Sequence, residues 1–368
     1  MSPLDGILVL DFSTLLPGPL TSLMLAEAGA EVIKIERPER GDEMRSYLPR
    51  FDDDSVNFHL LNRGKRSLAI DLKASGALDQ LRPLIERADV VIEQFRPGVM
   101  DRLGLGAAAI HAINPRIVYC SITGWGQNGP KSQVAAHDLN YLAETGLLGL
   151  TGGNDGAPVL PPVLTADIAG GAMPAVINIL LALRQREQEG KGAVLDIAMG
   201  DALFTFAYWG LGNGFHCGQW PQRSGELLTG GSPRYNIYRT ADGRHIAAAP
   251  LEDKFWMRFC TLIELDPIYR DPRADPTDTT AAVAARIAAR SAAEWHERFT
   301  GEDVCCSVVI TLEQAVADPH FTARGLFADR RLTLPVPIAA EFRSARAQLP
   351  APALGEYTMD DQSGTQSQ

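Results

Sequence analysis

The sequence predicts a mixed α/β protein with a Rossmann-like large domain and a smaller α+β domain. Apolar runs of strand length alternate with helical patterns over residues 6–123, which is typical of a parallel sheet covered by helices. A segment rich in glycine, proline and aromatic residues then interrupts the chain, and mostly helical patterns follow it. The length of 368 residues suits roughly two domains, and 45% apolar with 21% charged residues is an ordinary globular composition.

The large domain begins with a predicted βαβ unit. Residues 6–12 and 31–36 are predicted strands, and residues 21–28 form the helix between them, which Gly29 ends. The alternation continues with a helix over 77–86 and strands over 66–71, 90–93 and 117–123.

Composition changes divide the rest of the chain. We expect a large domain over 1–205, a linker over 206–230, a small domain over 231–322, and a return segment over 323–368 that completes the large domain. The small domain is predicted to contain a strand at 245–249 and helices at 254–265, 280–290 and 292–299. Ser291 and Glu294 have the spacing of a capping box for the last helix, and the polar tail 360–368 is expected to fray.

Charge and cysteine content exclude several functional classes. A formal charge of −11 argues against a nucleic-acid surface, so any anionic ligand must be met by local cations. The cysteines have no metal-site spacing, and their odd count without an export signal favours reduced thiols and a cytoplasmic protein. The apolar helical stretch 172–183 is shorter than the roughly 20 residues that a bilayer requires, which predicts a buried core helix and no membrane association.

The turn after the first strand is not that of a dinucleotide-binding protein. It consists of Leu15, Leu16, Pro17, Gly18 and Pro19 and lacks the three-glycine fingerprint, so NAD is not an expected cofactor. The second strand ends at Glu36 and Arg37, where a cation could meet a ribose phosphate.

A basic series surrounds the third predicted strand. Two interpretations of these cations are open: a solvated surface, or a site for a polyphosphate ligand at the strand ends of the sheet. The series comprises Arg63, Lys65, Arg66 and Lys73, followed by Arg96 and Arg102.

Two side chains carry a possible acid/base chemistry. His137 opens an apolar-periodic helix after the loop 123–130, where backbone N–H groups and the helix dipole favour an oxyanion and would lower the pKa of a histidine. Asp167 precedes Gly170 and Gly171, whose small size would let a bulky ligand approach the carboxylate. Considered singly, His137 is as readily a capping or packing residue, and Asp167 a helix N-cap.

Several motifs in order resemble the family III coenzyme A transferases and their racemase relatives, the α-methylacyl-CoA racemases, over nearly the whole chain. The resemblance lies in residues 32–38, 61–67, 69–73, 95–99, 103–106, 124–127, 136–141, 166–171, 190–192 and 353–356. It implies an interlocked homodimer, with coenzyme A bound on the Rossmann-like domain as part of a thioester substrate and with no prosthetic group or metal.

The same resemblance implies the roles of particular residues. The motif His137-Asp138-Leu139-Asn140-Tyr141 has the form of the racemase branch, because transferases of the family commonly carry tyrosine at the histidine position. Asp167 matches the nucleophile of transferases and an acid/base residue of racemases, and Glu252 matches the racemase glutamate that partners the histidine. The implied coenzyme A-binding residues are Arg37, Ile70, Asp71, Lys73, Gln94, Arg96, Arg102, Ala136 and Asp138.

The sequence thus predicts a racemase or epimerase that inverts C2 of 2-methylacyl-CoA thioesters through an enolate, an activity of lipid metabolism. An acyl-CoA:carboxylate CoA-transferase with Asp167 as nucleophile is the alternative, and a non-catalytic coenzyme A-binding protein would keep Arg37, Lys73 and Arg102 without needing His137. The chain departs from the racemase pattern at Val163, where asparagine is usual, and at Ile168, where an aromatic residue is usual.

Overall fold

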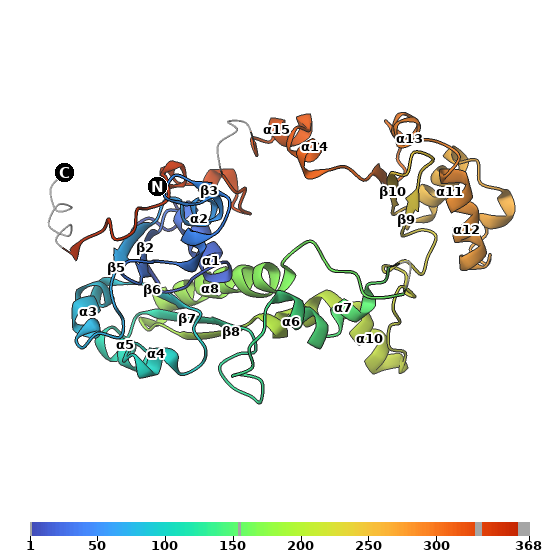
Figure 1. Cartoon of the computed structure of the whole chain (residues 1–368). Helices are drawn as coiled ribbons and strands as arrows, with labels where there is room; N and C mark the ends of the chain where they lie inside the picture. Colours follow the sequence, from blue (N-terminus) through green and yellow to red (C-terminus); the bar gives the residue numbers. More distant parts are fainter. Residues whose placement is uncertain (1, 154–155, 328–332, 360–368) are drawn as a thin grey trace. The chain divides into compact units, whose positions relative to one another are not determined.

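The computed structural model describes residues 2–153, 156–327 and 333–359 (Figure 1). The chain forms two compact units, which are described separately. The first unit comprises Met1–Thr145, Pro161–Phe206 and Arg330–Gln368, and the second comprises Gly146–Leu160 and Ala207–Asp329. The segment 146–160, expected in the large domain, therefore belongs to the second unit, because Gly149 and Leu150 bond to Arg223 and Ser224.

A six-stranded parallel sheet forms the centre of the first unit. Its strand order is β5-β2-β1-β6-β7-β8, and every neighbouring pair is parallel. The strands are β1 (Leu8–Asp11), β2 (Glu31–Glu36), β5 (Arg66–Ala69), β6 (Val90–Glu93), β7 (Val118–Thr123) and β8 (Val194–Ala198). All but β8 were predicted from the sequence.

The strand order reverses between β1 and β6. From β1 the chain continues to β2 and β5 on one side, and then returns to β6, β7 and β8 on the other. Loops after two neighbouring strands separate at such a point, and open α/β sheets bind ligands there, beyond the carboxyl ends of the strands. The loops that begin at Phe12 and at Gln94 flank this position.

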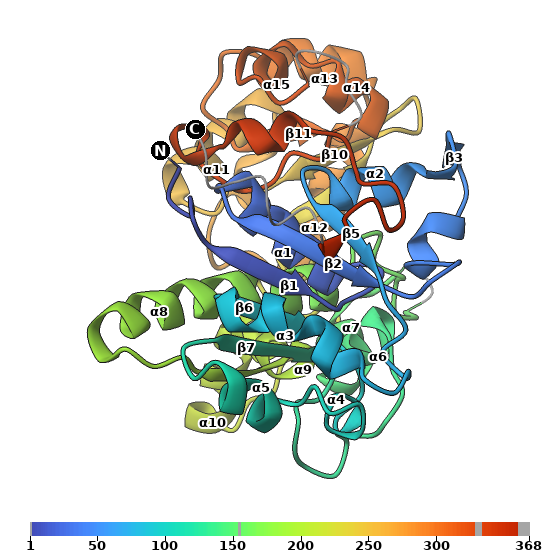
Figure 2. The ribbon, with the colours of Figure 1, turned by 90° about the vertical axis from the view of Figure 1, so that its left-hand side faces the viewer.

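Helices cover both faces of the sheet. Helix α1 (Pro17–Glu27), buried along its whole length, packs with α8 (Met173–Glu189) on one face. On the other face, α3 (Ala77–Arg87) packs with α5 (Ala107–Ile113), on the viewer's side of the strands in Figure 2. The alternating strand and helix pattern therefore produces the doubly covered sheet that the sequence predicts.

The long apolar helix is longer than expected. A π-helical segment, η2 (Ala166–Ala172), runs directly into α8, so the helical stretch is Ala166–Glu189 and not only 172–183. By length and composition alone, this helix could cross a membrane, although half of its most apolar 18-residue window is buried. The core helix of a soluble protein has the same properties.

The end of the chain returns to the first unit. Tyr357 donates its N–H to the carbonyl of Ser67 on edge strand β5 at 2.8 Å, and its ring is buried with the guanidinium of Arg66 above it at 4.1 Å. The described part of this return is 333–359. The start of the predicted return segment, 323–327, belongs instead to the second unit, where α15 (Pro319–Ala323) ends. The predicted frayed tail 360–368 lies outside the described residues.

The second unit has its own small core. Its sheet is antiparallel, with the order β11-β10-β9, and its strands are β9 (Asn236–Arg239), β10 (His245–Ala248) and β11 (Cys306–Val308). Trp256, Phe259, Trp295 and Phe299 pack between this sheet and the helices α11 (Asp253–Leu262), α12 (Pro276–Ile287) and α13 (Ala292–Phe299). The predicted capping box of α13 is confirmed, since Ser291 N–H donates to the Glu294 carboxylate at 2.8 Å and Ser291 Oγ accepts from Glu294 N–H.

Apart from five 3₁₀ turns among the described residues, the remaining elements are short strands and α-helices. They are the β3 (Arg50–Phe51) and β4 (Asp54–Ser55) hairpin, and the helices α2 (Val56–Asn62), α4 (Val99–Arg102), α6 (Asp138–Glu144), α7 (Leu147–Leu150), α9 (Met199–Leu203), α10 (Tyr208–Cys217) and α14 (Leu312–Val316).

Candidate active site

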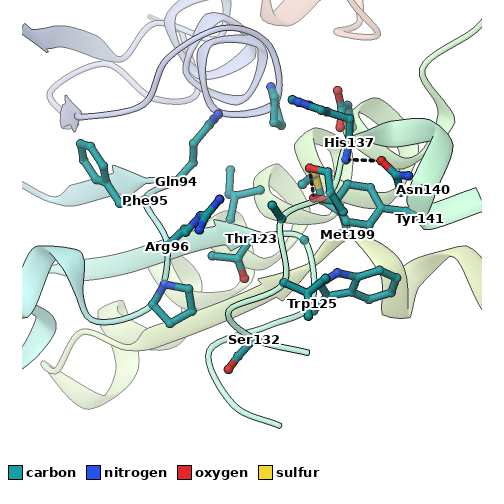
Figure 3. A pocket seen from close by; sticks show the side chains of 18 of the residues that line it. Gln94, Phe95, Arg96, Thr123, Trp125, Ser132, His137, Asn140, Tyr141 and Met199 are labelled. Atoms are coloured by element: carbon teal, nitrogen blue, oxygen red, sulfur yellow. Dashed lines mark hydrogen bonds between the residues drawn. The ribbon is translucent and has the colours of Figure 1, made fainter. Parts of the chain in front are cut away.

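A pocket of about 370 Å³ opens at the point where the strand order reverses (Figure 3). Three segments form most of its wall. They are the loop after β1 with Leu15, Leu16 and Pro17, the loop after β6 from Gln94 to Pro97, and the end of β7 with the chain that follows it, namely 122–125, Ser132 and 134–137. Asn140, Tyr141, Asp167 and Met199 complete the lining. All of these residues belong to the first unit.

His137 lies in this pocket at the start of α6. Its backbone has an extended conformation, its carbonyl accepts from Asn140 N–H at 2.8 Å, and its own N–H donates to Asn140 Oδ1 at 3.0 Å (Figure 3). The imidazole is exposed, so it is not a packed core histidine. The prediction that His137 begins a helix is therefore confirmed, and the side chain is left free to meet a ligand.

Asp167 reaches the same pocket from η2. Its N–H donates to Asp138 Oδ1 at 3.0 Å, and Asp138 is itself buried. Burial raises the pKa of the Asp167 carboxyl to about 6; the neighbouring Asp138 carboxylate contributes to this rise, and His137 opposes it. A carboxyl with such a pKa can exchange a proton near neutral pH, which suits an acid/base group.

The π-helical turn that carries Asp167 is held by close packing against Met199. A methyl group on Gly170 would lie 2.6 Å from the carbonyl oxygen of Met199, and one on Gly171 would lie 2.9 Å from the Met199 side chain. Both glycines are buried. The sequence-based hypothesis that they open the approach of a ligand is therefore wrong: they let η2 lie directly on α9. Such π turns occur often at functional sites.

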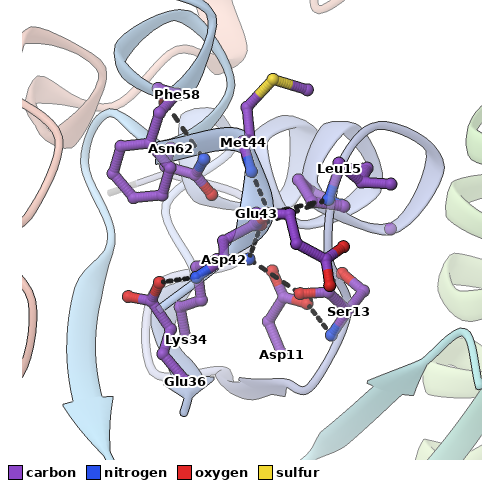
Figure 4. A network of polar contacts seen from close by, with 12 residues as sticks. Asp11, Ser13, Leu15, Lys34, Glu36, Asp42, Glu43, Met44, Phe58 and Asn62 are labelled. Atoms are coloured by element: carbon purple, nitrogen blue, oxygen red, sulfur yellow. Dashed lines mark hydrogen bonds and ion pairs between the residues drawn. The ribbon is translucent and has the colours of Figure 1, made fainter. Parts of the chain in front are cut away.

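Buried charges fix the wall that the loop after β1 contributes (Figure 4). The Asp42 carboxylate accepts the Leu15 N–H at 3.1 and 3.2 Å and pairs with Lys34 Nζ at 2.9 Å, and Lys34 Nζ also donates to the Ser13 carbonyl at 2.8 Å. Leu15 has a left-handed backbone with φ of 62°, a conformation that a leucine adopts only when its surroundings enforce it.

A second pair of charges holds the other end of that loop. Asp11 accepts from Ser13 N–H at 2.9 Å and from Lys65 Nζ at 3.3 Å, while Lys65 Nζ donates to the Pro19 carbonyl at 2.9 Å. Burial would raise the pKa of Asp11, but Lys34 and Lys65 hold it at about 2. The loop from Ser13 to Pro19 is therefore fastened to the fold at both ends.

Lys65 and Arg63, two members of the basic series, are not available to a ligand. Lys65 is buried in an ion pair with Asp11, and Arg63 is buried in an ion pair with Glu27. Both proposed interpretations are wrong for these two residues, because their cations stabilise the interior. Lys73, Arg96 and Arg102 are exposed, as a phosphate-binding cation must be.

The residues implied to bind coenzyme A lie in several places. Gln94, Arg96 and Ala136 line the pocket with His137 and Asp167. Arg37 lines a different hollow of about 570 Å³ with Arg40 and Arg50, and pairs with Glu43 at 3.1 Å. Asp71 and Lys73 are exposed after β5, and Arg102 is exposed on α4. The Ile70 side chain lies in the core, and the Asp138 carboxylate accepts a hydrogen bond from Asp167 N–H.

Glu252 belongs to the second unit. It is exposed, and its carbonyl begins α11 by accepting Trp256 N–H at 2.9 Å. Its pairing with His137 remains a prediction of the sequence. No cluster of three or more histidine, cysteine or acidic side chains that could hold a metal ion occurs in the described ranges.

Sequence reasoning did not assign several residues of the pocket. Thr123, Trp125 and Tyr141 lie in or beside motifs of the family, but the sequence predicts no role for their side chains. No sequence pattern marks Met199, Leu15 or Leu16 as pocket residues. Tyr141 donates its hydroxyl to the Ala136 carbonyl at 3.1 Å and packs edge-on to Trp125. It therefore fixes the segment that leads into His137.

This fold and pocket define an α/β enzyme with a histidine and a carboxyl of raised pKa in one cavity at the switch point of a parallel sheet. Residues 4–358 match the CoA-transferase family III, and the chain belongs to that family. It is 35% identical to the mouse alpha-methylacyl-CoA racemase over 97% of this chain and 92% of the relative. It is also 33% identical to the succinate–glutarate CoA-transferase of Agrobacterium fabrum over 96% and 94% of the two chains.

Solved structures agree with this assignment. A CAIB/BAIF family protein from Brucella suis matches with a TM-score of 0.83 at 30% identity, over 96% of this chain and 97% of the other. Relatives of both reaction types occur at similar identity, so membership establishes an enzyme of the transferase and racemase superfamily without choosing the reaction.

Replacement of Gly170 by alanine should destabilise the first unit by about 2 kcal/mol, because the new methyl group meets the Met199 carbonyl and forces the π turn to move. Denaturant unfolding measures this loss, and ligand binding should weaken with it. Gly212→Ala in α10 is the control, because the space around Gly212 is open. Equal stability of the two variants would contradict the packing argument.

Asp138→Asn should lower the pKa of Asp167 from about 6 toward its ordinary value, because a like charge is removed while the amide oxygen can still accept the Asp167 N–H. Carbon-13 NMR titration of the Asp167 carboxyl measures this shift without requiring turnover. Asp196→Asn, whose carboxylate accepts Gln127 N–H, is the control. An unchanged or higher pKa in Asp138→Asn would refute the role of the Asp138 charge.

Proposed function

We propose that the protein is a racemase or epimerase that inverts C2 of 2-methylacyl-CoA thioesters. The single observation that supports this most strongly is the presence of His137 and Asp167 in one pocket, with the pKa of Asp167 raised to about 6. Inversion needs two groups that can both take and return a proton. A transferase needs only the carboxylate as a nucleophile.

The proposed reaction begins with removal of the C2 proton, which is weakly acidic because the thioester carbonyl stabilises the resulting enolate. One of the pair, His137 or Asp167, takes the proton from one face of C2. The other, already protonated, returns a proton to the opposite face, so the two exchange roles with the configuration of the substrate. No group is gained or lost, and positioned acid/base residues contribute roughly 10² to 10⁴-fold each.

Polar groups at the pocket are suited to a coenzyme A thioester. Arg96 is an exposed cation in the pocket wall, and the helix that begins at Asp138 presents backbone N–H groups where negative charge develops on the thioester oxygen. Glu252 is proposed to orient His137 and raise its basicity. Val163 is 60% exposed, so its difference from asparagine does not disturb a packed core.

A CoA-transferase is the second candidate, and the 33% identity with the Agrobacterium fabrum enzyme favours it. In that reaction Asp167 attacks the thioester carbonyl, coenzyme A leaves as the thiolate, and a mixed anhydride forms. The thiolate then attacks the aspartyl carbonyl of the anhydride, releases the donor acid as its carboxylate and leaves an aspartyl-CoA thioester. The acceptor carboxylate attacks this thioester to form a second mixed anhydride and free thiolate. The thiolate attacks the acceptor acyl carbonyl, so the new acyl-CoA leaves and the Asp167 carboxylate is restored.

Deuterium incorporation at C2 separates these reactions. Incubated in D₂O with a 2-methylacyl-CoA and no acceptor acid, the protein should exchange the C2 hydrogen and interconvert the two epimers. His137→Ala and Asp167→Asn should each reduce the interconversion of the epimers by roughly 10² to 10⁴-fold, because inversion requires both proton-transfer groups. The remaining group can still exchange the C2 hydrogen of the epimer that faces it. Mass spectrometry and chiral separation measure the two outcomes.

His216→Ala is the matched control, because His216 is an exposed histidine outside the pocket. Absence of exchange by the unaltered protein, with an acyl group on Asp167 that hydroxylamine releases, would refute the racemase and support the transferase.

We also propose that the protein acts as a homodimer. Met173, Ile177, Leu180 and Leu181 are 37%, 57%, 43% and 62% exposed and recur at helical spacing on one side of α8. An apolar stripe of this kind usually marks a protein interface.

Leu181→Glu should shift the protein from dimer toward monomer, because a carboxylate placed in an apolar interface must be desolvated. Light scattering after size-exclusion chromatography measures the mass. Gln188→Glu adds the same charge to an exposed position of α8 and should leave the dimer intact. A monomeric unaltered protein would contradict the proposal.

A further inference from the structure

The segment Thr123–Gln127 concentrates buried polar atoms that have no partner within the protein. Among the described residues, six buried side-chain nitrogen or oxygen atoms are unpaired, and three of them are Thr123 Oγ1, Trp125 Nε1 and Gln127 Nε2. Buried polar atoms in folded proteins are almost always paired, so a cluster of exceptions along five residues calls for an explanation. Such a group in a ligand pocket points to the ligand.

Two of these atoms belong to residues that line the pocket. Thr123 ends β7 and is only 6% exposed, and Trp125 follows it after one residue (Figure 3). The indole N–H is solely a donor, and a threonine hydroxyl can donate as well. A group that satisfies both must accept hydrogen bonds, which means an oxygen of the ligand.

The indole is held in place before any ligand arrives. Its ring meets Tyr141 edge-on, with centroids 5.1 Å apart and planes at 75°, and Lys131 Nζ lies 4.7 Å from the ring centroid. Thr123 is fixed by pairing with Ala198 on β8. Both donors are covered when no ligand is present, so small side-chain rotations must expose them as an acceptor enters. A site that holds such donors discriminates strongly between ligands with and without a matching acceptor.

We infer that Thr123 Oγ1 and Trp125 Nε1 form a polar subsite of the pocket that binds a hydrogen-bond-accepting oxygen of an acyl-CoA. The inference that the ligand is an acyl-CoA rests on the proposed function, and the subsite adds which atoms of the pocket would bind it. The oxygen has two possible sources, a substituent on the acyl group or an amide carbonyl of the pantetheine arm of coenzyme A.

Thr123→Val and Trp125→Phe test this subsite, because each removes one donor and keeps most of the side-chain volume. Calorimetry would compare their affinities for coenzyme A, 2-methylbutanoyl-CoA and 3-hydroxy-2-methylbutanoyl-CoA. The last two differ by a single hydroxyl oxygen. Each variant should bind the accepting ligand about tenfold more weakly, the loss expected for one hydrogen bond.

The pattern of losses identifies the source of the oxygen. Equal weakening for all three ligands assigns the pantetheine arm, and weakening confined to the hydroxylated thioester assigns the acyl group. Thr279→Val, which removes another unpaired buried hydroxyl at a residue that does not line this pocket, should leave all three affinities within twofold. If Thr123→Val and Trp125→Phe behave like Thr279→Val, the subsite does not exist.

Stability without ligand provides a second measurement. Because valine replaces an unpaired buried hydroxyl, Thr123→Val should have an unaltered or higher melting temperature when no ligand is present, together with a smaller rise on adding the accepting ligand. A lower melting temperature without ligand would show that the hydroxyl has a partner inside the protein and would overturn the inference. Binding is measured without turnover, so a protein that binds but shows no C2 exchange would refute only the racemase.

Discussion

The candidate active site depends on charges buried beneath the first loop of the sheet. Lys34 and Asp42, and Lys65 and Asp11, have side chains with 0% exposure, and together they hold the loop from Ser13 to Pro19. Burying ionisable groups is costly unless each is paired and hydrogen-bonded, and burial lowers the pKa of Lys65 to about 7 even beside Asp11. Removing one partner from a buried pair destabilises a protein by about 3 to 5 kcal/mol. The charges are paired here, and the loop they fix is the one that supplies Leu15, Leu16 and Pro17 to the pocket.

A second constraint acts from the opposite side of the pocket. The π turn of η2 places Asp167 on the cavity, and its geometry is set by contact between Gly170 and the Met199 backbone. Asp138 links this turn to α6, because its carboxylate accepts the Asp167 N–H while the preceding residue, His137, lines the pocket. His137 and Asp167 are thus linked through the hydrogen bond between Asp138 and Asp167, and the Asp138 carboxylate also contributes to the raised pKa of Asp167.

The pocket combines His137 and Asp167 with apolar side chains and unpaired donors. Leu15, Leu16, Val134 and Met199 supply apolar surface to its wall. A ligand that displaces water against this surface would strengthen the electrostatic interactions inside the cavity. Thr123 and Trp125 add polarity at one part of the wall, where a ligand must compensate their desolvation. The cavity thus holds His137 with Asp167 in one part and the two unpaired donors in another. The family includes relatives named as a racemase and as CoA-transferases, so one fold carries different acyl-CoA reactions.

The sequence by itself determined the elements whose signals are local. Strands β2 and β6 and helix α13 have the predicted bounds, because apolar periodicity and the capping box of Ser291 depend only on neighbouring residues. Motif resemblance likewise identified the family and proposed His137 with Asp167. Only the tertiary structure decided how distant residues are used. Arg63 and Lys65 lie in interior ion pairs, and Gly170 and Gly171 pack against Met199. The segment 146–160 belongs to the second unit, and the side chains of Thr123 and Trp125 have unpaired donors. Whether a cation is buried on a carboxylate or exposed to a ligand depends on partners far apart in the chain, which local sequence patterns do not specify.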